Sequence, residues 1–454
     1  MKIINPYNGE VIDEITLLNK SQVFEKLSKA VLAKSKMRQL SSGDKSNILH
    51  AIIDGIKLNF EEFVTTIVKE SGKPYRYAKG EVNRTIQTFT IAAEECKRLP
   101  HELIDLDSTE NGRNLQGEVI YFPRGVVFGI SPFNFPLNLA VHKIAPAIAA
   151  GCPILLKPSS KTPLTMVLLD KVIQETALPK GGFQLIHCSR EIGNELLSHK
   201  DVDVLSFTGS PDVGWKMKEQ AGKKQTVLEL GGNAAAIVAQ DANLRIAVDE
   251  LLIGGFAYSG QVCIHTQRIY VHESLMDEFI SLYIAGVEQL EIGDPMDEAT
   301  EFGVMIDETN AKRVETWVNE ALGAGAECLV GGSRVNSFYA PTVLTNVPKG
   351  QKVRDEEVFG PVVIVESFSA IDDAISEVND CRWGLQAAIF TDSIQIRNQA
   401  FNELNVGGVI HNKSTSFRVD DMPYGGIKDS GFGREGVRYT MLDFLEPKLL
   451  VRKK

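Results

Sequence analysis

Short apolar runs that alternate with helical stretches are the feature that most constrains the fold of this 454-residue chain. In a first series the runs are 153–156, 183–187 and 204–207, with the most regular helical pattern at 164–175. In a second series they are 268–271, 328–330 and 362–365, between expected helices at 276–290 and 310–322. Such alternation is typical of βαβ units and a parallel sheet. We therefore expect an α/β protein with two parallel-sheet domains.

The segments around these series differ in their hydrophobic period. Residues 21–100 place apolar side chains at three- and four-residue spacing, for example at 48–56 and 60–68, which predicts helices. From 113 to 130 the period falls to two, which predicts paired strands around a turn at 123–125. No repeat or low-complexity tract marks a boundary, so the domain limits follow these changes of pattern.

Composition excludes several classes of function. A net charge of −11 and a pI near 5.4 argue against a nucleic-acid or anionic-membrane partner. No window approaches the roughly 20 apolar residues of a membrane span, and the first residues lack the apolar core of a signal peptide. Six scattered cysteines form no CxxC pair, and eight histidines form no HExxH motif, so we expect no metal site. A cytoplasmic protein in a reducing compartment is expected.

Cys263 and Glu229 are the candidate reactive pair. Cys263 ends the run Gly-Gln-Val-Cys at 260–263, and Glu229 precedes it by 34 residues (263 − 229) in Leu-Glu-Leu-Gly-Gly. A nucleophilic thiol that attacks a carbonyl needs donors for the oxyanion. Asn134 supplies such a donor, because Pro132 and Pro136 stiffen its backbone. Together these residues predict covalent catalysis followed by hydrolytic release, with Glu229 activating water.

Each of these residues also has a structural interpretation. A cysteine in an apolar context is commonly buried and inert. Glu229 beside two glycines is also consistent with a solvated carboxylate at a strand end. Asn134 is also suited to bridge backbone groups in a turn. The ordered neighbours of Cys263 favour the catalytic interpretation.

Six sequence blocks occur in one order along nearly the whole chain. They are Phe-Asn-Phe-Pro at 133–136, Phe-Thr-Gly-Ser at 207–210, Leu-Glu-Leu-Gly-Gly at 228–232, Gly-Gln-x-Cys at 260–263, Glu-Val-Phe-Gly-Pro at 357–361 and Pro-Tyr-Gly-Gly at 423–426. This pattern resembles the NAD(P)-dependent aldehyde dehydrogenases. The resemblance implies two Rossmann-like domains, a dinucleotide domain of 1–106 and 125–229 and a catalytic domain of 230–441. It also implies a small β oligomerisation arm of 107–124 and 442–454, in which a strand at 447–451 joins a hairpin, and hence a homodimer or homotetramer.

The dinucleotide site is predicted at strand ends and not at the one GxGxxG match. That match, 431–436, follows a polar turn and lies 18 residues from the end of the chain (454 − 436), so a backbone role in a turn is expected. Glycines and hydroxyls after the runs 154–156 and 204–207 are better placed, because ligands of parallel sheets bind beyond the carboxyl ends of strands. The resemblance implies cofactor contacts from Lys157, Gly209, Ser210, Gly214 and Glu357, and Phe359 either packs on the nicotinamide or is ordinary core.

Ser160 departs from the pattern of NAD-preferring relatives, which carry a glutamate there. A carboxylate would repel a 2′-phosphate, whereas Ser160 is neutral and Lys161 follows it. NAD or NADP is therefore open as the cofactor. The alternative is that Ser160 caps the helix that begins near Pro163.

The substrate is predicted to be a small, hydroxylated or anionic aldehyde. The length and the stretches 134–143 and 405–412 are similar to those of the lactaldehyde and short hydroxy- or phosphono-aldehyde dehydrogenases. The candidates to bind a polar tail are Arg84, His142, His265 and Arg418. The rival predictions are a CoA-acylating dehydrogenase, for which a base at Glu229 is not needed, and a non-catalytic cofactor-binding protein of the same fold.

Overall fold

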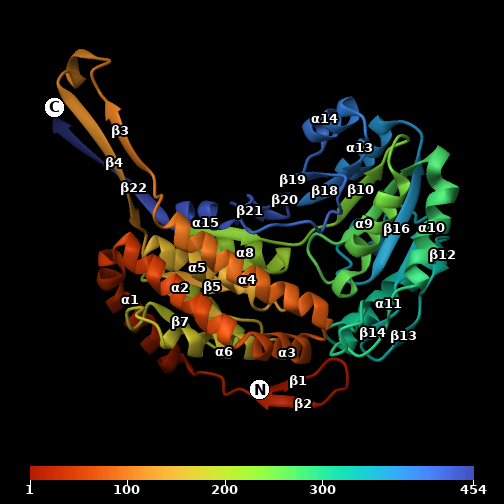
Figure 1. The fold of residues 1–454 in the computed structure, drawn as a ribbon, viewed down its shortest axis with the longest axis horizontal. Coiled ribbons are helices and arrows are strands. Elements are labelled where there is room, and N and C mark those ends of the chain that lie inside the picture. Colours follow the sequence, from red (N-terminus) through yellow and green to blue (C-terminus); the bar gives the residue numbers. More distant parts are fainter.

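The computed structural model describes residues 1–454, which form two α/β lobes and a projecting arm (Figure 1). The sheet of the first lobe has the order β21-β9-β8-β5-β6-β7, in which β5 to β9 are parallel and β21 is antiparallel. Its strands are β5 (Val127–Ile130), β6 (Ile154–Lys157), β7 (Phe183–Leu185), β8 (Val204–Thr208), β9 (Gln225–Glu229) and β21 (Gly431–Phe432). The strand order therefore reverses between β5 and β8, which creates a crevice at their carboxyl ends.

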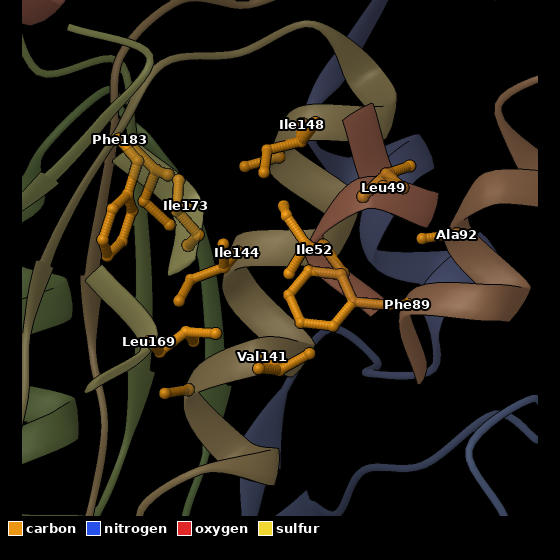
Figure 2. Close-up of a cluster of buried hydrophobic side chains, with 14 of the residues drawn as sticks. Leu49, Ile52, Phe89, Ala92, Val141, Ile144, Ile148, Leu169, Ile173 and Phe183 are labelled. Carbon is orange, nitrogen blue, oxygen red and sulfur yellow. The ribbon is translucent and has the colours of Figure 1, made fainter. Parts of the chain in front are cut away.

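Helices cover both faces of this sheet. They are α1 (Lys20–Gln39), α2 (Ser42–Leu58), α3 (Phe60–Ser71), α4 (Tyr75–Glu95), α5 (Asn138–Ala150), α6 (Leu164–Gln174), α7 (Arg190–Ser198), α8 (Pro211–Ala221) and α15 (Val437–Asp443). Figure 2 shows how α2, α4, α5 and α6 interlock through Ile52, Phe89, Ile144 and Leu169, all fully buried. Every residue of α5 is buried, so packing on all sides fixes this helix, which begins directly after the loop that carries Asn134.

The second lobe is built on a seven-stranded sheet of order β12-β15-β16-β11-β10-β18-β19, parallel except for β12. Its strands are β10 (Ala234–Val238), β11 (Thr266–His272), β12 (Glu327–Val330), β15 (Thr342–Thr345), β16 (Val362–Phe368), β18 (Gln386–Phe390) and β19 (Gly408–His411). Its helices are α9 (Leu244–Phe256), α10 (Met276–Glu288), α11 (Glu308–Gly323), α12 (Lys352–Asp355), α13 (Ile371–Asn379) and α14 (Ile394–Glu403). Two Rossmann-like sheets are thus confirmed.

Short elements complete the fold. They are β1 (Lys2–Ile4) with β2 (Val11–Glu14), β13 (Arg334–Val335) with β14 (Phe338–Tyr339), β17 (Trp383–Gly384) with β20 (Ile427–Lys428), and the 3-10 turns η1 (Glu110–Gly112), η2 (Ala257–Gly260) and η3 (Glu273–Leu275). No helix combines the length and apolar character that crossing a membrane requires.

The arm corrects one prediction. The expected pairing of strands around 123–125 is wrong, because the chain there leaves one sheet and enters another. β4 (Leu115–Pro123) pairs with β3 (His101–Asp105) and with β22 (Leu445–Lys453), whereas β5 is central in the first sheet (Figure 1). The alternation of 113–130 thus belongs to two separate strands. Pairing of the C-terminal strand with the arm is confirmed, with Pro447 opposite Tyr121.

The structure also bears on where the domains meet. β3 lies in the arm, although 101–105 falls before the expected arm. Residues 431–443 pack against the first lobe, since β21 pairs with β9 and α15 contacts α5. We therefore propose that the arm begins at residue 101 and that 431–443 belong with the dinucleotide domain.

Candidate active site

A cleft of about 550 Å³ lies at the crevice where the strand order of the first sheet reverses. Nine of the ten predicted site residues line it, and they come from both lobes. They are Asn134, Lys157, Ser160, Gly209, Ser210, Glu229, Cys263, Glu357 and Phe359. The fold thereby brings Ile130 and Phe359, which are 229 positions apart in the sequence (359 − 130), to one cavity.

The loop that carries Cys263 is held in a strained conformation. Tyr258, Ser259 and Gly260 all have left-handed backbone angles, with φ of 49°, 53° and 67°. For the two residues that are not glycine, such angles cost on the order of 1–3 kcal/mol each, and they persist only where surrounding contacts enforce them. Tyr258 donates its hydroxyl to the carbonyl of Ser71 at 3.0 Å, and Ser259 donates to that of Gly303 at 3.0 Å. The nucleophile is therefore presented by a loop that is fixed before any ligand binds.

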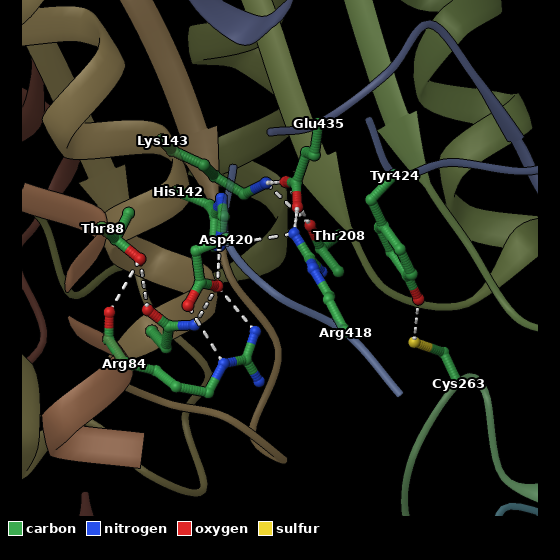
Figure 3. A network of polar contacts seen from close by, with 11 residues as sticks. Arg84, Thr88, His142, Lys143, Thr208, Cys263, Arg418, Asp420, Tyr424 and Glu435 are labelled. Carbon is green, nitrogen blue, oxygen red and sulfur yellow. Dashed lines mark hydrogen bonds and ion pairs between the residues drawn. The ribbon is translucent and has the colours of Figure 1, made fainter. Parts of the chain in front are cut away.

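The Cys263 thiol is half-buried and has one hydrogen-bonding side chain. Its Sγ lies 2.9 Å from the hydroxyl of Tyr424 (Figure 3). Burial raises the pKa of the thiol to about 12, while the contact with Tyr424 acts in the opposite direction. The thiolate that attacks a carbonyl thus has to be generated inside the site.

Glu229 ends β9 and is buried in the cleft wall. Neither carboxylate oxygen has a hydrogen-bond partner. Burial and the neighbouring Glu435 raise its pKa well above the usual range for a glutamate, although Arg418 and Lys143 oppose them. A carboxyl group with a raised pKa and free oxygens is suited to take a proton from water.

Two glycines make room for Glu229. A Cβ on Gly425 would lie 2.8 Å from its Oε1, at a φ of 153° that disfavours other residues. Gly431 pairs with Glu229 across β21 and β9, and a Cβ there would lie 2.7 Å from the Leu228 carbonyl. The GxGxxG match at 431–436 is therefore an edge strand next to Glu229, followed by a turn. It does not connect a strand to a helix of a dinucleotide-binding unit.

Asn134 connects the first lobe to the nucleophile loop. Its Nδ2 donates to the carbonyl of Gln261 at 2.9 Å, two residues before Cys263. The backbone-bridging role is thus present, and it does not exclude the catalytic one. An amide nitrogen carries two hydrogens, so the second remains for an oxyanion formed at the thiol.

A buried polar network that includes Lys143, Glu435 and Arg418 is drawn in Figure 3, and the charges of these three residues act on Glu229. Lys143 donates to Thr208 at 2.7 Å and to Glu435 at 2.8 Å, and Arg418 approaches Glu435 at 3.3 Å. Burial disfavours the charged form of Glu435, but Lys143 and Arg418 outweigh it and hold its pKa below the usual range. The network therefore favours the ionised form of Glu435, whereas the neighbouring Glu229 is easier to protonate.

Three of the four predicted tail-binding residues lie together. Asp420 is buried and accepts hydrogen bonds from Arg84, at 2.6 and 3.1 Å, and from His142 at 2.8 Å. Arg418 lies 3.4 Å from His142 and stacks on the Tyr424 ring at 3.8 Å, with its Nε buried and unpartnered. His265 does not join this group. Its Nε2 contacts the Gly255 carbonyl at 2.9 Å, and this contact links the end of α9 to the loop that carries Cys263.

One part of the cleft lining is cationic. Lys157 and Arg190 line it, and neither forms an ion pair with a carboxylate. Burial and the charge of Arg190 both contribute to a lowered pKa of Lys157. These two cations line the same cleft as Ser159 and Ser160, and such a set of positive charges and hydroxyls is suited to bind an anion.

The helix-cap alternative for Ser160 is wrong. The first amides of α6 are satisfied by buried Glu70, which accepts from Leu164 at 2.7 Å and Thr165 at 3.1 Å, and Ser160 makes no such bond. Lys161 is engaged with Asp307 at 3.0 Å and does not line the cleft. The cations that share this part of the cleft lining with Ser160 are therefore Lys157 and Arg190, and not Lys161.

The residues for which contacts with the phosphates and the nicotinamide are predicted have defined surroundings. Ser210 precedes the first turn of α8, whose unpaired amides favour anions. Gly214 does not line the cleft; its missing Cβ would lie 2.4 Å from Leu230, so it allows α8 to pack closely. Glu357 accepts from the Gly232 amide at 3.1 Å, and burial raises its pKa to about 7. Phe359 meets Phe133 edge to face at 5.7 Å.

Several site residues were missed by sequence reasoning. Tyr424 lies inside a quoted block, yet only the fold brings its hydroxyl to Cys263. Arg190 has no motif of its own, and Arg313 enters the cleft from α11 and donates to the Val358 carbonyl at 2.7 Å. Lys143 and Glu435 are 292 residues apart (435 − 143) and become neighbours through α5 and the turn after β21.

Comparison with known proteins shows the family of this chain. The sequence profile of the aldehyde dehydrogenase family matches residues 1–450. The chain is 41% identical over 454 residues to a 3-sulfolactaldehyde dehydrogenase of Priestia aryabhattai, covering 99% of this chain and 94% of the relative. It is 37% identical over 458 residues to a lactaldehyde dehydrogenase of Methanococcus aeolicus, covering 99% and 97%.

Solved structures show the same fold. Aldehyde dehydrogenase 21 from Physcomitrella patens, in complex with the reaction product succinate, is 43% identical with a TM-score of 0.98, covering 100% of this chain and 95% of that one. Glyceraldehyde-3-phosphate dehydrogenase from Methanocaldococcus jannaschii, complexed with NADP, is 38% identical with a TM-score of 0.96, covering 100% and 99%. The chain belongs to the aldehyde dehydrogenase family and is an NAD(P)-dependent oxidoreductase that acts on aldehydes.

Proposed function

We propose that Cys263 is the nucleophile, Asn134 the oxyanion donor and Glu229 the base that activates water. Cys263 attacks the aldehyde carbon, and the Asn134 amide with the Cys263 backbone N–H stabilises the oxyanion of the thiohemiacetal. A nicotinamide dinucleotide, when bound, accepts a hydride. Glu229 then deprotonates the water that hydrolyses the thioester, which releases the acid and restores the thiol. The observation that carries this proposal is the shared cleft, in which the Glu229 oxygens are free.

Hydrolysis is favoured over transfer of the thioester to CoA. A buried carboxyl group with no partner is costly to keep, and the fold leaves space for it with Gly425. A CoA-acylating enzyme has no need of such a group. Acid formation without CoA is the expected result.

We also propose that the aldehyde is small and carries a hydroxyl or an anionic group. Arg418 stacks on the ring whose hydroxyl contacts Cys263, and its Nε is buried and has no hydrogen-bond partner. Arg84 remains partly exposed while it is paired with Asp420. The names of the relatives agree with such a substrate, since they cite sulfolactaldehyde, lactaldehyde and succinate.

A panel of matched aldehydes tests this substrate class. We expect lactaldehyde to exceed propanal, and succinic semialdehyde to exceed pentanal, in kcat/KM. Arg84→Gln should lower kcat/KM for the anionic aldehyde by about 10- to 100-fold, because Asp420 loses its neutralising partner. The kcat/KM for propanal should change little. Arg98→Gln, on an exposed arginine, is the control. A preference for long alkyl or aromatic aldehydes would reject the proposal.

For the cofactor, we propose that the protein accepts NADP, because Ser160 carries no charge and Lys157 and Arg190 are free of carboxylate partners. Ser160→Glu should weaken the binding of NADP, because it introduces a negative charge beside the negatively charged 2′-phosphate. At an effective dielectric near 20, repulsion of about 2–4 kcal/mol is the upper range, or roughly 30- to 1000-fold in affinity. The affinity for NAD should fall little, because the new carboxylate can accept hydrogen bonds from its ribose hydroxyls.

The matched variant is Arg190→Gln, which should also weaken NADP selectively by removing a cation. The measurement is kcat/KM for both dinucleotides in all three proteins. Strict dependence of the wild type on NAD, or equal losses for both cofactors in Ser160→Glu, would contradict this assignment.

Finally, we propose a homo-oligomer assembled through the arm. β22 and β3 are edge strands with unpaired backbone groups on their outer sides, and Leu103, Leu449 and Leu450 are exposed on them. Such an edge invites a strand of another chain. A mass in solution of one 49.9 kDa chain by light scattering would contradict the proposal.

A further inference from the structure

Tyr424 provides the one side-chain hydrogen bond that the nucleophilic sulfur makes. Its hydroxyl lies 2.9 Å from the Cys263 Sγ, although the two residues are 161 positions apart (Figure 3). The backbone of Tyr424 is fixed by paired hydrogen bonds with Glu435, one of them at 2.9 Å from the Tyr424 amide to the Glu435 carbonyl. The ring is buried and is covered by the Arg418 guanidinium at 3.8 Å. The hydroxyl is therefore held at the sulfur by its surroundings.

The sulfur has no cationic partner of its own. No lysine, arginine or histidine forms a hydrogen bond or an ion pair with Cys263. A thiolate in a buried site needs a donor or a positive charge to be stabilised. The Tyr424 hydroxyl is placed to be that donor.

The Tyr424 hydroxyl is suited to donate a hydrogen bond while it keeps its own proton. Burial and the adjacent Cys263 raise the pKa of its hydroxyl, so the phenol stays neutral. The Arg418 cation over the ring opposes this rise, because it withdraws electron density, and it thereby strengthens the hydroxyl as a donor.

We propose that Tyr424 is a catalytic residue whose hydroxyl donates a hydrogen bond to the Cys263 thiolate, both when the nucleophile forms and when the sulfur leaves the acyl group. In the first step the S–H bond breaks, the proton passes to solvent, and the electron pair stays on sulfur. In the second step the C–S bond of the thioester breaks and its electron pair returns to sulfur. The phenol keeps its own proton in both steps.

The hydrogen bond is worth most in these two states. A thiolate is a full anion, whereas the sulfur of a thiohemiacetal or a thioester is a weak acceptor. The interaction thus stabilises the attacking and the departing thiolate more than the intermediates between them. It does not depend on which aldehyde is the substrate.

The test is the pH profile of alkylation of the free enzyme by iodoacetamide, without cofactor or aldehyde. Tyr424→Phe keeps the ring under Arg418 and removes only the hydroxyl. The profile should move to higher pH by about one unit or more, and the rate at pH 7.5 should fall at least roughly 10-fold, as for loss of a hydrogen bond to an ion. Mass spectrometry should locate the adduct on Cys263. A profile that superimposes on the wild type would overturn the proposal.

The control is Tyr283→Phe, which removes a buried hydroxyl bound to the Leu251 carbonyl at 3.1 Å in the second lobe and should leave the profile unchanged. Dinucleotide binding and the melting temperature report whether each variant folds. If Tyr424→Phe does not fold, replacement of Tyr424 by 3-fluorotyrosine, a stronger donor, should shift the profile to lower pH, and no shift would overturn the proposal. Because no aldehyde is used, a wrong substrate class cannot produce either result.

Discussion

Cys263→Ala should abolish aldehyde oxidation and leave dinucleotide binding nearly intact. In the proposed mechanism the thiol acts in the chemistry, whereas most of the proposed cofactor contacts come from the first lobe, after β6 and β8. Loss of a single oxyanion donor slows turnover by about 10²–10³, and loss of the nucleophile should cost more. The measurements are the steady-state rate with a short hydroxyaldehyde and the dissociation constant of NADP by fluorescence titration.

The control is Cys328→Ala, since this exposed cysteine lies on β12 at the edge of the second sheet. It should retain full activity. Substantial turnover by Cys263→Ala, with the cofactor bound normally, would reject the covalent mechanism.

Glu229→Gln should separate the two half-reactions. Hydride transfer precedes hydrolysis, so the variant should reduce about one cofactor per active site in a rapid burst and then stall. The amide is nearly isosteric and has the same free space beside Gly425, but it cannot take a proton from water. Stopped-flow absorbance measures the burst, and mass spectrometry should detect an acyl group on Cys263.

A second carboxyl group provides the comparison for this result. Glu357→Gln alters a residue of the cofactor part of the cleft, so it should reduce the rate without accumulating an acyl enzyme. Unchanged steady-state turnover by Glu229→Gln would remove Glu229 from the role of base.

Much of the fold was predictable because it follows local periodicity. The buried runs that became β6, β8 and β16 have few polar residues, as expected for strands covered on both faces. The hairpin expected around 123–125 failed for a physical reason. Period two indicates a strand and not its partner, and β4 finds its partner in β22, more than 300 residues later.

The site was predictable only where chemistry is carried by a motif. Cys263, Glu229 and Asn134 lie in blocks with recognisable spacing, and they line one cleft. Tyr424 and Arg190 belong to the site only because the fold brings distant segments together, and no local motif marks that position. The Ser160 cap failed because Glu70, from α3, reaches the start of α6 first, and a sequence pattern does not reveal such a long-range carboxylate.

The anchoring of the nucleophile loop limits how the two lobes can move. Cys263 belongs to the second lobe in sequence, yet Tyr258 and Gln261, which both precede it in the same loop, are hydrogen-bonded to Ser71 and Asn134 of the first lobe. A hinge that parted the lobes would break both bonds and displace the sulfur. Exchange of cofactor and product should therefore proceed by local movements of side chains along the cleft, and the rate of release should respond to solvent viscosity less than that of an enzyme with a closing hinge.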